Sequence, residues 1–328
     1  MNSIRFDKVK NWTLLAASAI CMTIGAAQAA TWPSRPIKVV VPFPPGATPD
    51  IMARLVGDRL SVNLGQPVII ENKPGGSGLI AIGAVQNAVP DGYTLLLADT
   101  GHLAINPALM KDLPYDPMMD FLPVSRFTEQ DFSVIVRADS PDKTIGDLLE
   151  RSKKKEGGLT YGTSGVGSVH HIGSERLKIL TGAHFMHVPY KGTIQSVPAL
   201  LSGEIDFMIS SATPVMGQWK SGKIRILARG SDKRSPLMPD VPTLRESGIP
   251  LTISITLGML APKGTPSEVV QRLSTEVNKV LESPEVKQKV ATQDFTVRGS
   301  TPQAFTASIR EQLQEYKNVI QETGITAR

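Results

Sequence analysis

Hydrophobic and polar positions follow two alternating patterns along most of the chain. Short apolar runs rich in β-branched residues predict buried strands, and longer segments with apolar residues three or four positions apart predict helices. Strands are expected at residues 37–41, 68–71, 94–98, 133–136, 159–162, 184–188, 205–209, 224–228 and 258–261. Helices are expected to begin near residues 49, 77, 144, 168, 192, 213 and 265, with a last one over about 301–321. This alternation is typical of α/β proteins, in which helices cover both faces of parallel sheets.

The last two expected helices carry the clearest apolar stripes. Residues three and four positions apart on a helix share one face, so each stripe should pack onto a sheet. The stripes consist of Val269, Val270, Leu273, Val277 and Val280, and of Phe305, Ile309, Leu313, Tyr316 and Ile320.

The length of 328 residues exceeds the usual size of one open-sheet domain, so two lobes are expected. The chain could cross between them near residues 124–136 and return near 251–261. We therefore predict a discontinuous first lobe of residues 30–127 and 251–328, a second lobe of residues 128–250, and a cleft between them.

The first 29 residues have the pattern of a secretory signal peptide. Basic residues open the chain, an uncharged apolar run follows, and Ala27-Gln28-Ala29 predicts cleavage after Ala29. Cys21 is the only cysteine and lies in this segment, so the exported protein would have no disulfide or thiolate metal site. Lipidation at Cys21 is the weaker alternative, because Ile20 stands where a small residue is expected.

Charge adds little to the picture. The chain has 35 Lys and Arg against 30 Asp and Glu, and these residues are scattered. This composition gives no support for a nucleic-acid-binding or membrane-binding surface.

The segment from the first expected strand into the first helix is a candidate anion site. Thr48 is placed as helix cap, Pro49 in the first turn, and Asp50 as an acid near the N-terminus. The N–H groups of Gly46, Ala47 and Thr48, with the positive end of the helix, could hold a carboxylate or phosphate without Lys or Arg. A purely structural turn, with its amides in water, remains the alternative.

A second loop of this kind occupies residues 163–168. Its amides and the hydroxyls of Thr163, Ser164 and Ser168 precede a helix, as in the first loop, and ligands of open α/β sheets bind beyond the carboxyl ends of strands. The alternative is that Gly165 and Gly167 only permit a tight turn and that Ser168 is the N-cap of the following helix.

A rival interpretation is a secreted dinucleotide-dependent enzyme. Gly76-x-Gly78-x-x-Ala81 matches a dinucleotide fingerprint, and Asp99 follows at the distance of a ribose-binding acid. However, residues 72–75 separate these glycines from the preceding strand, whereas the fingerprint requires the turn at the strand end.

Other candidate catalytic or metal-binding residues lack a supporting pattern. His184 and His187 should point to opposite faces of a strand, Ser164 has no nucleophile-elbow motif, and Asp206 before a strand is typical of a loop anchor. We therefore predict no catalytic residue, no metal and no cofactor.

An ordered set of motifs covers essentially the whole mature chain and resembles the Bug family, the periplasmic solute receptors of tripartite tricarboxylate transporters. The motifs are WPSRPIKVVVPFPPG at 32–46, ENKPGGSG at 71–78, PDGYTLL at 90–96, INPALM at 105–110, YGTSGVGSVHH at 161–171, HVPYKG at 187–192, KSGKIRILA at 220–228 and PDVPTLRESG at 239–248. The resemblance implies a two-lobed α/β periplasmic binding protein of the type II-like, Venus flytrap kind, with a discontinuous first lobe.

The resemblance also implies which residues contact the ligand. In that family backbone amides, hydroxyls and bridging waters hold the ligand carboxylate rather than a salt bridge. The positions carried over are Phe43, Gly46, Ala47 and Thr48, with Thr100 and His102 near the rim, and then Ser164, Gly165, Gly167, Ser168, Thr193, Ser210 and Ser211 in the second lobe.

Two residues depart from the family pattern, Ala47 in place of a second glycine and Pro49 in place of a non-proline residue. If position 47 requires a positive φ, alanine costs about 1 kcal/mol there. Pro49 removes one N–H donor.

The function implied is that of a monomeric receptor, which captures a small carboxylate and presents it to membrane permease subunits. Tricarboxylates, dicarboxylates, amino acids and aromatic acids such as terephthalate are all compatible with a site whose one aromatic wall is Phe43. A receptor that senses a ligand for a signalling partner is the remaining alternative.

Overall fold

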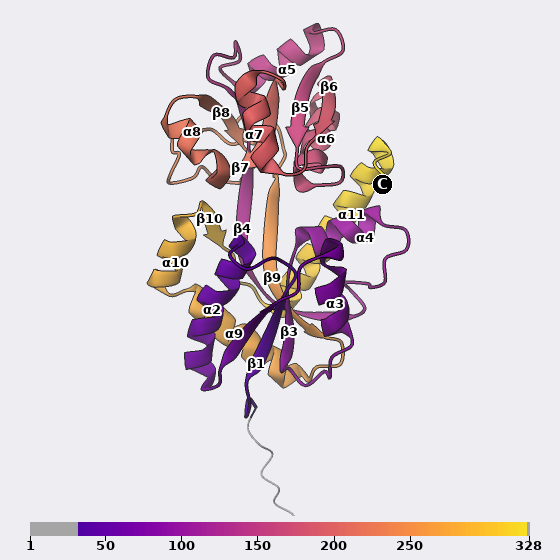
Figure 1. The fold of residues 1–328 in the computed structure, drawn as a ribbon, viewed down its shortest axis with the longest axis vertical. Helices are drawn as coiled ribbons and strands as arrows, with labels where there is room; N and C mark the ends of the chain where they lie inside the picture. The colour runs from indigo at the N-terminus through magenta and orange to yellow at the C-terminus, as the bar shows by residue number, and fades with distance from the viewer. Residues whose placement is uncertain (1–31, 327–328) are drawn as a thin grey trace, which may run out of the picture.

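The computed structural model describes residues 32–326, so the expected signal peptide, its cleavage site and Cys21 lie outside the described residues. Two lobes lie one above the other and are joined by two long strands, β4 (Phe121–Arg137) and β9 (Ser254–Pro262) (Figure 1). No helix within residues 32–326 is long and apolar enough to cross a membrane.

The strands form one continuous sheet in the order β2-β1-β3-β9-β4-β7-β5-β6, with β10 and β8 also paired to β4. Lobe 1 contains β1 (Ile37–Val41), β2 (Val68–Asn72), β3 (Thr94–Asp99) and β10 (Phe295–Val297). Lobe 2 contains β5 (Leu159–Thr163), β6 (Phe185–Pro189), β7 (Phe207–Ser211) and β8 (Ile224–Arg229). The pairings of β1 with β2 and β3, and of β5 with β6 and β7, are parallel, whereas β4 and β9 run antiparallel to their neighbours. The expectation of parallel sheets was therefore wrong at the crossing strands.

The helices cover both faces of each lobe. In lobe 1, α2 (Thr48–Leu64), α9 (Ser267–Leu281) and α10 (Pro284–Ala291) cover one face, and α3 (Leu79–Gln86) and the first half of α11 (Pro302–Thr323) cover the other. In lobe 2, α5 (Ile145–Lys154) and α6 (Val169–Thr181) lie opposite α7 (Thr193–Ser202) and α8 (Met216–Lys220). Short helical turns complete the fold at η1 (Gly76–Gly78), η2 (Gly101–Ile105), α4 (Asn106–Leu109) and η3 (Thr213–Val215).

Strand β4 passes from one lobe to the other at Asp131 and Phe132. Residues up to Asp131 pair with β9, and residues from Phe132 pair with β7 and β8. The crossing lies within the segment expected to carry it, but the strand extends 12 residues further toward the N-terminus than the predicted Ser133. The apolar pattern marks only its fully buried end.

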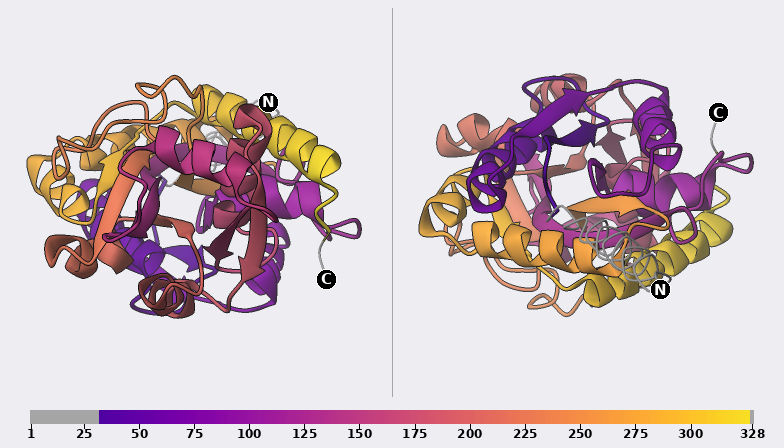
Figure 2. Two further views of the ribbon diagram at one scale, coloured as in Figure 1. Left: turned by 90° about the horizontal axis from the view of Figure 1, so that it is seen from above. Right: turned by 90° about the horizontal axis from the view of Figure 1, so that it is seen from below.

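Helix α11 contacts both lobes. Phe305 and Ile309 belong to a core cluster of lobe 1, whereas Tyr316 and Ile320 pack in a core cluster of lobe 2. Figure 2 shows the helix, in yellow, running along the outside of the molecule. The range 251–328 assigned to lobe 1 stays a prediction, and its last helix is shared between the lobes.

Candidate ligand-binding site

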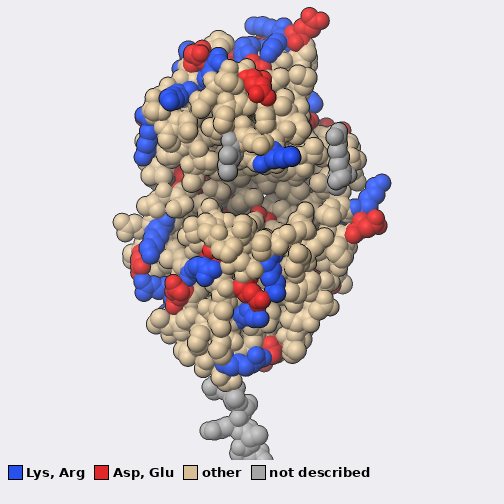
Figure 3. Space-filling view, viewed as in Figure 1, with Lys and Arg blue, Asp and Glu red and all other residues tan. Residues whose placement is uncertain are grey.

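A cleft separates the two lobes. Figure 3 shows it as a hollow across the middle of the molecule, and Lys, Arg, Asp and Glu are sparse on its visible walls. In Figure 1, α2 of lobe 1 and α7 of lobe 2 both begin at this level. Because the first N–H groups of a helix have no intrahelical acceptor, both walls of the cleft offer backbone donors.

The loop from β1 to α2 takes its one left-handed step at Gly46, whose φ is 81°. Ala47 is extended, with φ −68° and ψ 154°. The conformational penalty considered for alanine at position 47 therefore does not arise. Thr48 was predicted as the helix cap and this was wrong, because Ala47 occupies the N-cap position and no side chain caps it.

Asp50 holds this loop together. Its Oδ2 accepts hydrogen bonds from Gly46 N–H at 2.8 Å and from Arg54 Nε at 3.1 Å, and its Oδ1 accepts one from Asn72 Nδ2 at 2.8 Å. Asn72 Nδ2 also donates to the Phe43 carbonyl at 3.1 Å. Burial opposes ionisation of Asp50, but the hydrogen bonds from Arg54, Gly46 and Asn72 outweigh it and lower its pKa.

The backbone donors left at the first loop differ from those predicted. Gly46 N–H is bound to Asp50, and Ala47 N–H donates to the Pro44 carbonyl at 3.2 Å. The N–H groups of Thr48 and Asp50 have no acceptor within residues 32–326. Of the three predicted amides, only that of Thr48 is therefore available to a ligand.

His102 and Phe43 form an aromatic corner beside this loop. Their rings meet edge to face with centroids 5.3 Å apart. His102 Nδ1 lies 2.6 Å from Asp99 Oδ1, and a Cβ on Gly78 would come within 2.3 Å of the His102 ring. The glycine thus allows the histidine ring to lie directly against the backbone.

Thr100 is placed differently from its predicted rim position. Its hydroxyl accepts a hydrogen bond from Thr256 N–H at 2.9 Å and lies 3.4 Å from Gln312 Oε1. The residue is 1% exposed. Its hydroxyl is therefore committed to β9 and α11 and not to the cleft.

The second loop, between β5 and α6, uses much of its own hydrogen-bonding capacity. Gly165 N–H donates to Thr163 Oγ1 at 3.1 Å, and Ser168 Oγ donates to the Gly165 carbonyl at 2.8 Å. Ser168 is the side-chain cap of α6, as the alternative interpretation had it, because its Oγ accepts from His171 N–H. The N–H groups of Ser164 and Val166 have no acceptor within the described residues.

Val166 was not among the predicted contacts. It is half exposed at the tip of the loop, at 40%, between two glycines with positive φ. An apolar side chain gives no sequence signal that its backbone N–H lacks an acceptor.

Histidines support this second loop from behind. His171 Nδ1 accepts the Gly167 N–H at 3.1 Å, and its ring stacks on that of His187 with centroids 3.8 Å apart. His187 Nε2 lies 2.6 Å from Thr163 Oγ1. Burial lowers the pKa of His187 to about 4, and it also lowers the pKa of His171. A neutral His171 is what leaves Nδ1 free to accept the Gly167 N–H.

Gly167 also forms part of the contact between the lobes. A Cβ at this position would lie 2.4 Å from Leu109 Cδ2, and its φ is 75°. Leu109 belongs to α4 of the first lobe. A substitution at Gly167 would therefore disturb the lobe contact as well as any ligand.

The remaining predicted contacts lie at the ends of β7 and α7. Thr193 is the first residue of α7, after Gly192 with φ 108°. Ser211 ends β7 and is 9% exposed. Ser210 is fully buried, and its hydroxyl has no hydrogen-bond partner in the described part of the chain.

The dinucleotide fingerprint has no supporting geometry. Residues 73–75 separate the end of β2 from the turn at Gly76–Gly78. The carboxylate of Asp99 accepts from His102 N–H at 3.2 Å in addition to its contact with the His102 ring. It is therefore engaged locally and not presented to a ribose.

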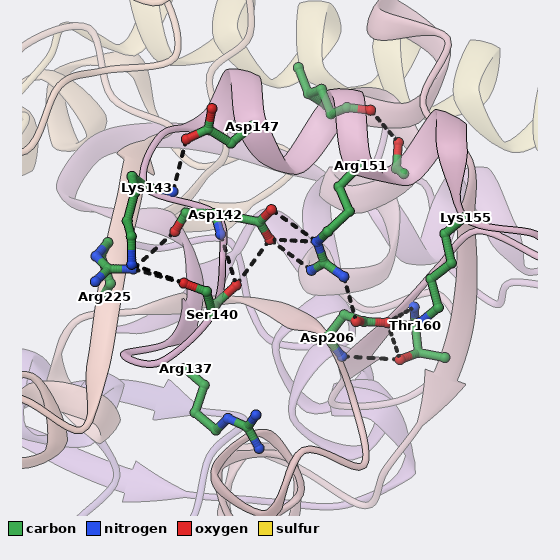
Figure 4. A network of polar contacts seen from close by, with 12 residues as sticks. Arg137, Ser140, Asp142, Lys143, Asp147, Arg151, Lys155, Thr160, Asp206 and Arg225 are labelled. Atoms are coloured by element: carbon green, nitrogen blue, oxygen red, sulfur yellow. Dashed lines mark hydrogen bonds and ion pairs between the residues drawn. The ribbon is translucent and has the colours of Figure 1, made fainter.

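Asp206 anchors a loop at the far end of lobe 2, as predicted (Figure 4). Its carboxylate accepts hydrogen bonds from Thr160 N–H and Oγ1, from Lys155 Nζ and from Arg151 Nη1 at 2.8 to 3.0 Å. Burial opposes its ionisation, but the hydrogen bonds from Lys155, Thr160 and Arg151 outweigh it and lower the pKa to about 2. Within residues 32–326, no three His, Asp, Glu or Cys side chains are grouped as a metal site requires.

Comparison with known proteins agrees with this architecture. A family model described as the tripartite tricarboxylate transporter family receptor matches residues 52–325. BugT of Bordetella pertussis is 34% identical over 296 residues, which covers 90% of this chain and 91% of BugT. A solved R. palustris protein with adipate is 32% identical with a TM-score of 0.76, covering 90% of this chain and 99% of its own.

MatC from Rhodopseudomonas palustris, solved with bound malate, is 30% identical with a TM-score of 0.71 and covers 88% of this chain and 100% of its own. These matches confirm the resemblance to Bug proteins and the two-lobed α/β fold. The chain therefore belongs to the family of tripartite tricarboxylate transporter receptors, which are periplasmic solute-binding proteins.

Proposed function

We propose that this receptor captures a small carboxylate between its lobes and delivers it to membrane permease subunits. The observation that carries the proposal is the set of unpaired backbone N–H groups at Thr48 and Asp50 in lobe 1 and at Ser164 and Val166 in lobe 2. Each hydrogen bond to a charged oxygen contributes about 1.5–3 kcal/mol. A few such bonds with apolar burial approach the roughly 8 kcal/mol of micromolar affinity.

The ligand class that fits best is a small dicarboxylate. Two relatives have been solved with adipate and with malate, both of which carry two carboxylates. Donors on opposite walls would let one carboxylate engage each lobe, and engagement of both would favour the closed arrangement of the lobes.

The proposal also includes side chains around the ligand. Phe43 and His102 would form the wall of lobe 1, and the hydroxyls of Ser164, Thr193 and Ser211 would line lobe 2. Closure would change the outer surface of the receptor, which gives the permease a means of recognising the loaded form.

Binding is tested on residues 30–328 after unfolding and refolding to remove any retained ligand. Adipate, malate, citrate and terephthalate are titrated by calorimetry, with adipamide as a control of the same length without charge. Saturation at 100 times Kd stabilises by about 2.7 kcal/mol, which corresponds to a rise in Tm of about 4 °C for a chain of this size. If none of the acids binds saturably or raises Tm, carboxylate capture is wrong.

The role of the second loop is tested at Val166. Val166→Pro removes the N–H, whereas Val166→Ala keeps it and serves as the matched control. We expect at least tenfold weaker dicarboxylate binding for the proline variant and a change within about twofold for alanine, since a lost hydrogen bond of about 1.4 kcal/mol is a factor of ten. Equal affinity in all three proteins, each checked for folding by circular dichroism, would remove Val166 from the site.

Delivery is tested separately from binding. Photo-crosslinking in membranes that contain the permease subunits should capture the loaded receptor more strongly than the empty one. Capture of a signalling receptor in place of a permease would favour the sensing alternative.

A further inference from the structure

A second cavity lies beside the hinge, which is the point where β4 crosses between the lobes at Asp131 and Phe132. Its volume is about 560 Å³, and its walls come from the loop 231–237 of lobe 2, from α10 and β10 of lobe 1, and from Asp131 where β4 crosses between the lobes. None of the predicted cleft residues lines it. The volume falls in the range of about 300–1,000 Å³ that is usual for small-molecule sites.

Arg229 forms the buried polar part of the cavity wall. It is 2% exposed, and its Nη1 donates to Asp294 Oδ2 at 2.7 Å. Asp294 also accepts from Ser235 Oγ at 2.8 Å. Arg229 Nε is buried and has no acceptor within residues 32–326. A guanidinium that is nearly excluded from water is thus incompletely hydrogen-bonded, which is costly.

The second acid beside Arg229, Asp131, compensates its charge less well than Asp294 does. Asp131 Oδ2 lies 3.6 Å from Arg229 Nη2, which is too long for a hydrogen bond. Burial, together with repulsion from Glu129, raises the pKa of Asp131 to about 7. Near neutral pH a substantial fraction of Asp131 is therefore uncharged.

Further cations surround the opening. Arg234, Lys287 and Arg298 each pair with a glutamate outside the cavity lining. Lys233 is exposed and has no ion-pair partner among the described residues. Asp232 also lines the cavity and pairs with Arg245, so among the described residues Lys233 is the one cation of the lining without an ion-pair partner.

The other part of the wall is apolar. Leu237, Phe295 and Val297 line the cavity together with Ala291 at the end of α10. Leu237 is 44% exposed, so its side chain offers apolar surface to an occupant of the cavity.

We propose that this hinge cavity is a second binding site, which takes a small organic anion with an apolar body. The carboxylate lies toward Arg229 and Lys233, and the body packs against Leu237, Phe295 and Val297. This site is independent of the proposed cleft ligand, because the two share no lining residue.

The test uses 4-fluorobenzoate, followed by ¹⁹F NMR during titration of the mature protein. Lys233→Gln removes the uncompensated charge, and Ala291→Trp fills the cavity without changing charge. Lys317→Gln on the exposed side of α11 is the matched charge control. We expect saturable binding that is at least fivefold weaker in the two cavity variants and unchanged in the control, with no binding of 4-fluorobenzamide.

Three outcomes would overturn the proposal. The first is an absence of saturation up to 50 mM probe, which would limit the binding free energy to about 1.8 kcal/mol. The second is equal affinity of Lys233→Gln and wild type for the probe. The third is weaker probe binding in Val166→Pro alone, which would place the probe in the cleft. Lys233 is exposed, so its variant should fold even if Ala291→Trp does not. Dicarboxylate titration of the same variants should give wild-type affinity, which separates failure of this site from failure of the cleft.

Discussion

Replacement of Asp50 by asparagine tests whether a buried carboxylate holds the first cleft loop in place. The variant keeps the shape of the side chain and one acceptor oxygen. However, it presents an NH₂ group to a region where Gly46 N–H and Asn72 Nδ2 already donate. One of these donors loses its acceptor, and the remaining bond loses its charge assistance.

The magnitude follows from the three partners. The Asp50 side chain is 3% exposed, so its bonds from Gly46 and Asn72 fall in the range of about 1.5–3 kcal/mol for charged acceptors. Arg54 is 49% exposed, which limits its contribution to about 0.5–1 kcal/mol. Since asparagine retains part of these interactions, we expect Asp50→Asn to lower the free energy of unfolding by about 2–3 kcal/mol at pH 7.

The effect should depend on pH in one direction. The pKa of Asp50 is lower in the folded protein than its ordinary value of 3.8. Its ionised form therefore stabilises the fold above about pH 4, and this contribution is lost as pH falls through the lowered pKa. The difference in free energy of unfolding between wild type and Asp50→Asn should be constant above about pH 4 and should shrink as pH falls below it.

Urea unfolding followed by circular dichroism measures this difference, with Asp58→Asn as the control. Asp58 lies in the same helix, is exposed and has no ion-pair partner within residues 32–326. Loss of the loop clamp should also weaken dicarboxylate binding, because the Thr48 and Asp50 amides are no longer held toward the cleft. The reasoning is refuted if Asp50→Asn and Asp58→Asn have the same stability within about 0.5 kcal/mol.

Other predictions concern the cleft wall and the second lobe. Gly78→Ala should destabilise the protein by about 1–3 kcal/mol, because its Cβ would meet the His102 ring at 2.3 Å and φ is 87°. Gly83→Ala, in open space on α3, should stabilise it by about 0.5–1 kcal/mol. Equal melting temperatures of the two variants would contradict this. Asp206→Ala should lower the free energy of unfolding by about 2 kcal/mol at pH 7, and this difference from wild type should vanish as pH falls from about 4 through the folded pKa of about 2. A difference that stays constant over this pH range would count against Asp206 as the loop anchor. The pKa of His187 is about 4 in the folded protein, below its ordinary value of 6.5, so wild type should lose stability as pH falls from 6.5 to 4. His187→Gln should lose less stability over the same range, and an equal shift of the urea midpoint in both proteins would refute this.

The sequence predicted the local elements well where one feature is repeated within a few residues. The β-branched run at Ile37–Val41, the helix start near Ser168 and the stripe from Val269 to Val280 all appear as expected. Each depends on contacts that a strand or helix makes with its own next turn or with one buried face.

The site was only partly predictable, because sequence shows where amides can be free but not which ones are already used. Asp50 was recognised as a first-turn acid, yet its bond to Gly46 N–H removes one of the predicted donors. Thr100 directly follows the end of β3, which suggested a position at the rim of the cleft. Its hydroxyl instead accepts a hydrogen bond from Thr256 N–H, 156 residues away.

By itself the sequence determined the α/β pattern and the two-lobed receptor family. Only the tertiary structure decided that β4 runs through both lobes and pairs antiparallel with β9 in lobe 1, that His171 stacks on His187, and that Arg229 meets Asp294 at the hinge. Periodicity and capping are local and can be read along the chain. In contrast, long-range hydrogen bonds and ion pairs depend on which segments the fold brings together, and these decide which polar groups remain free for a ligand.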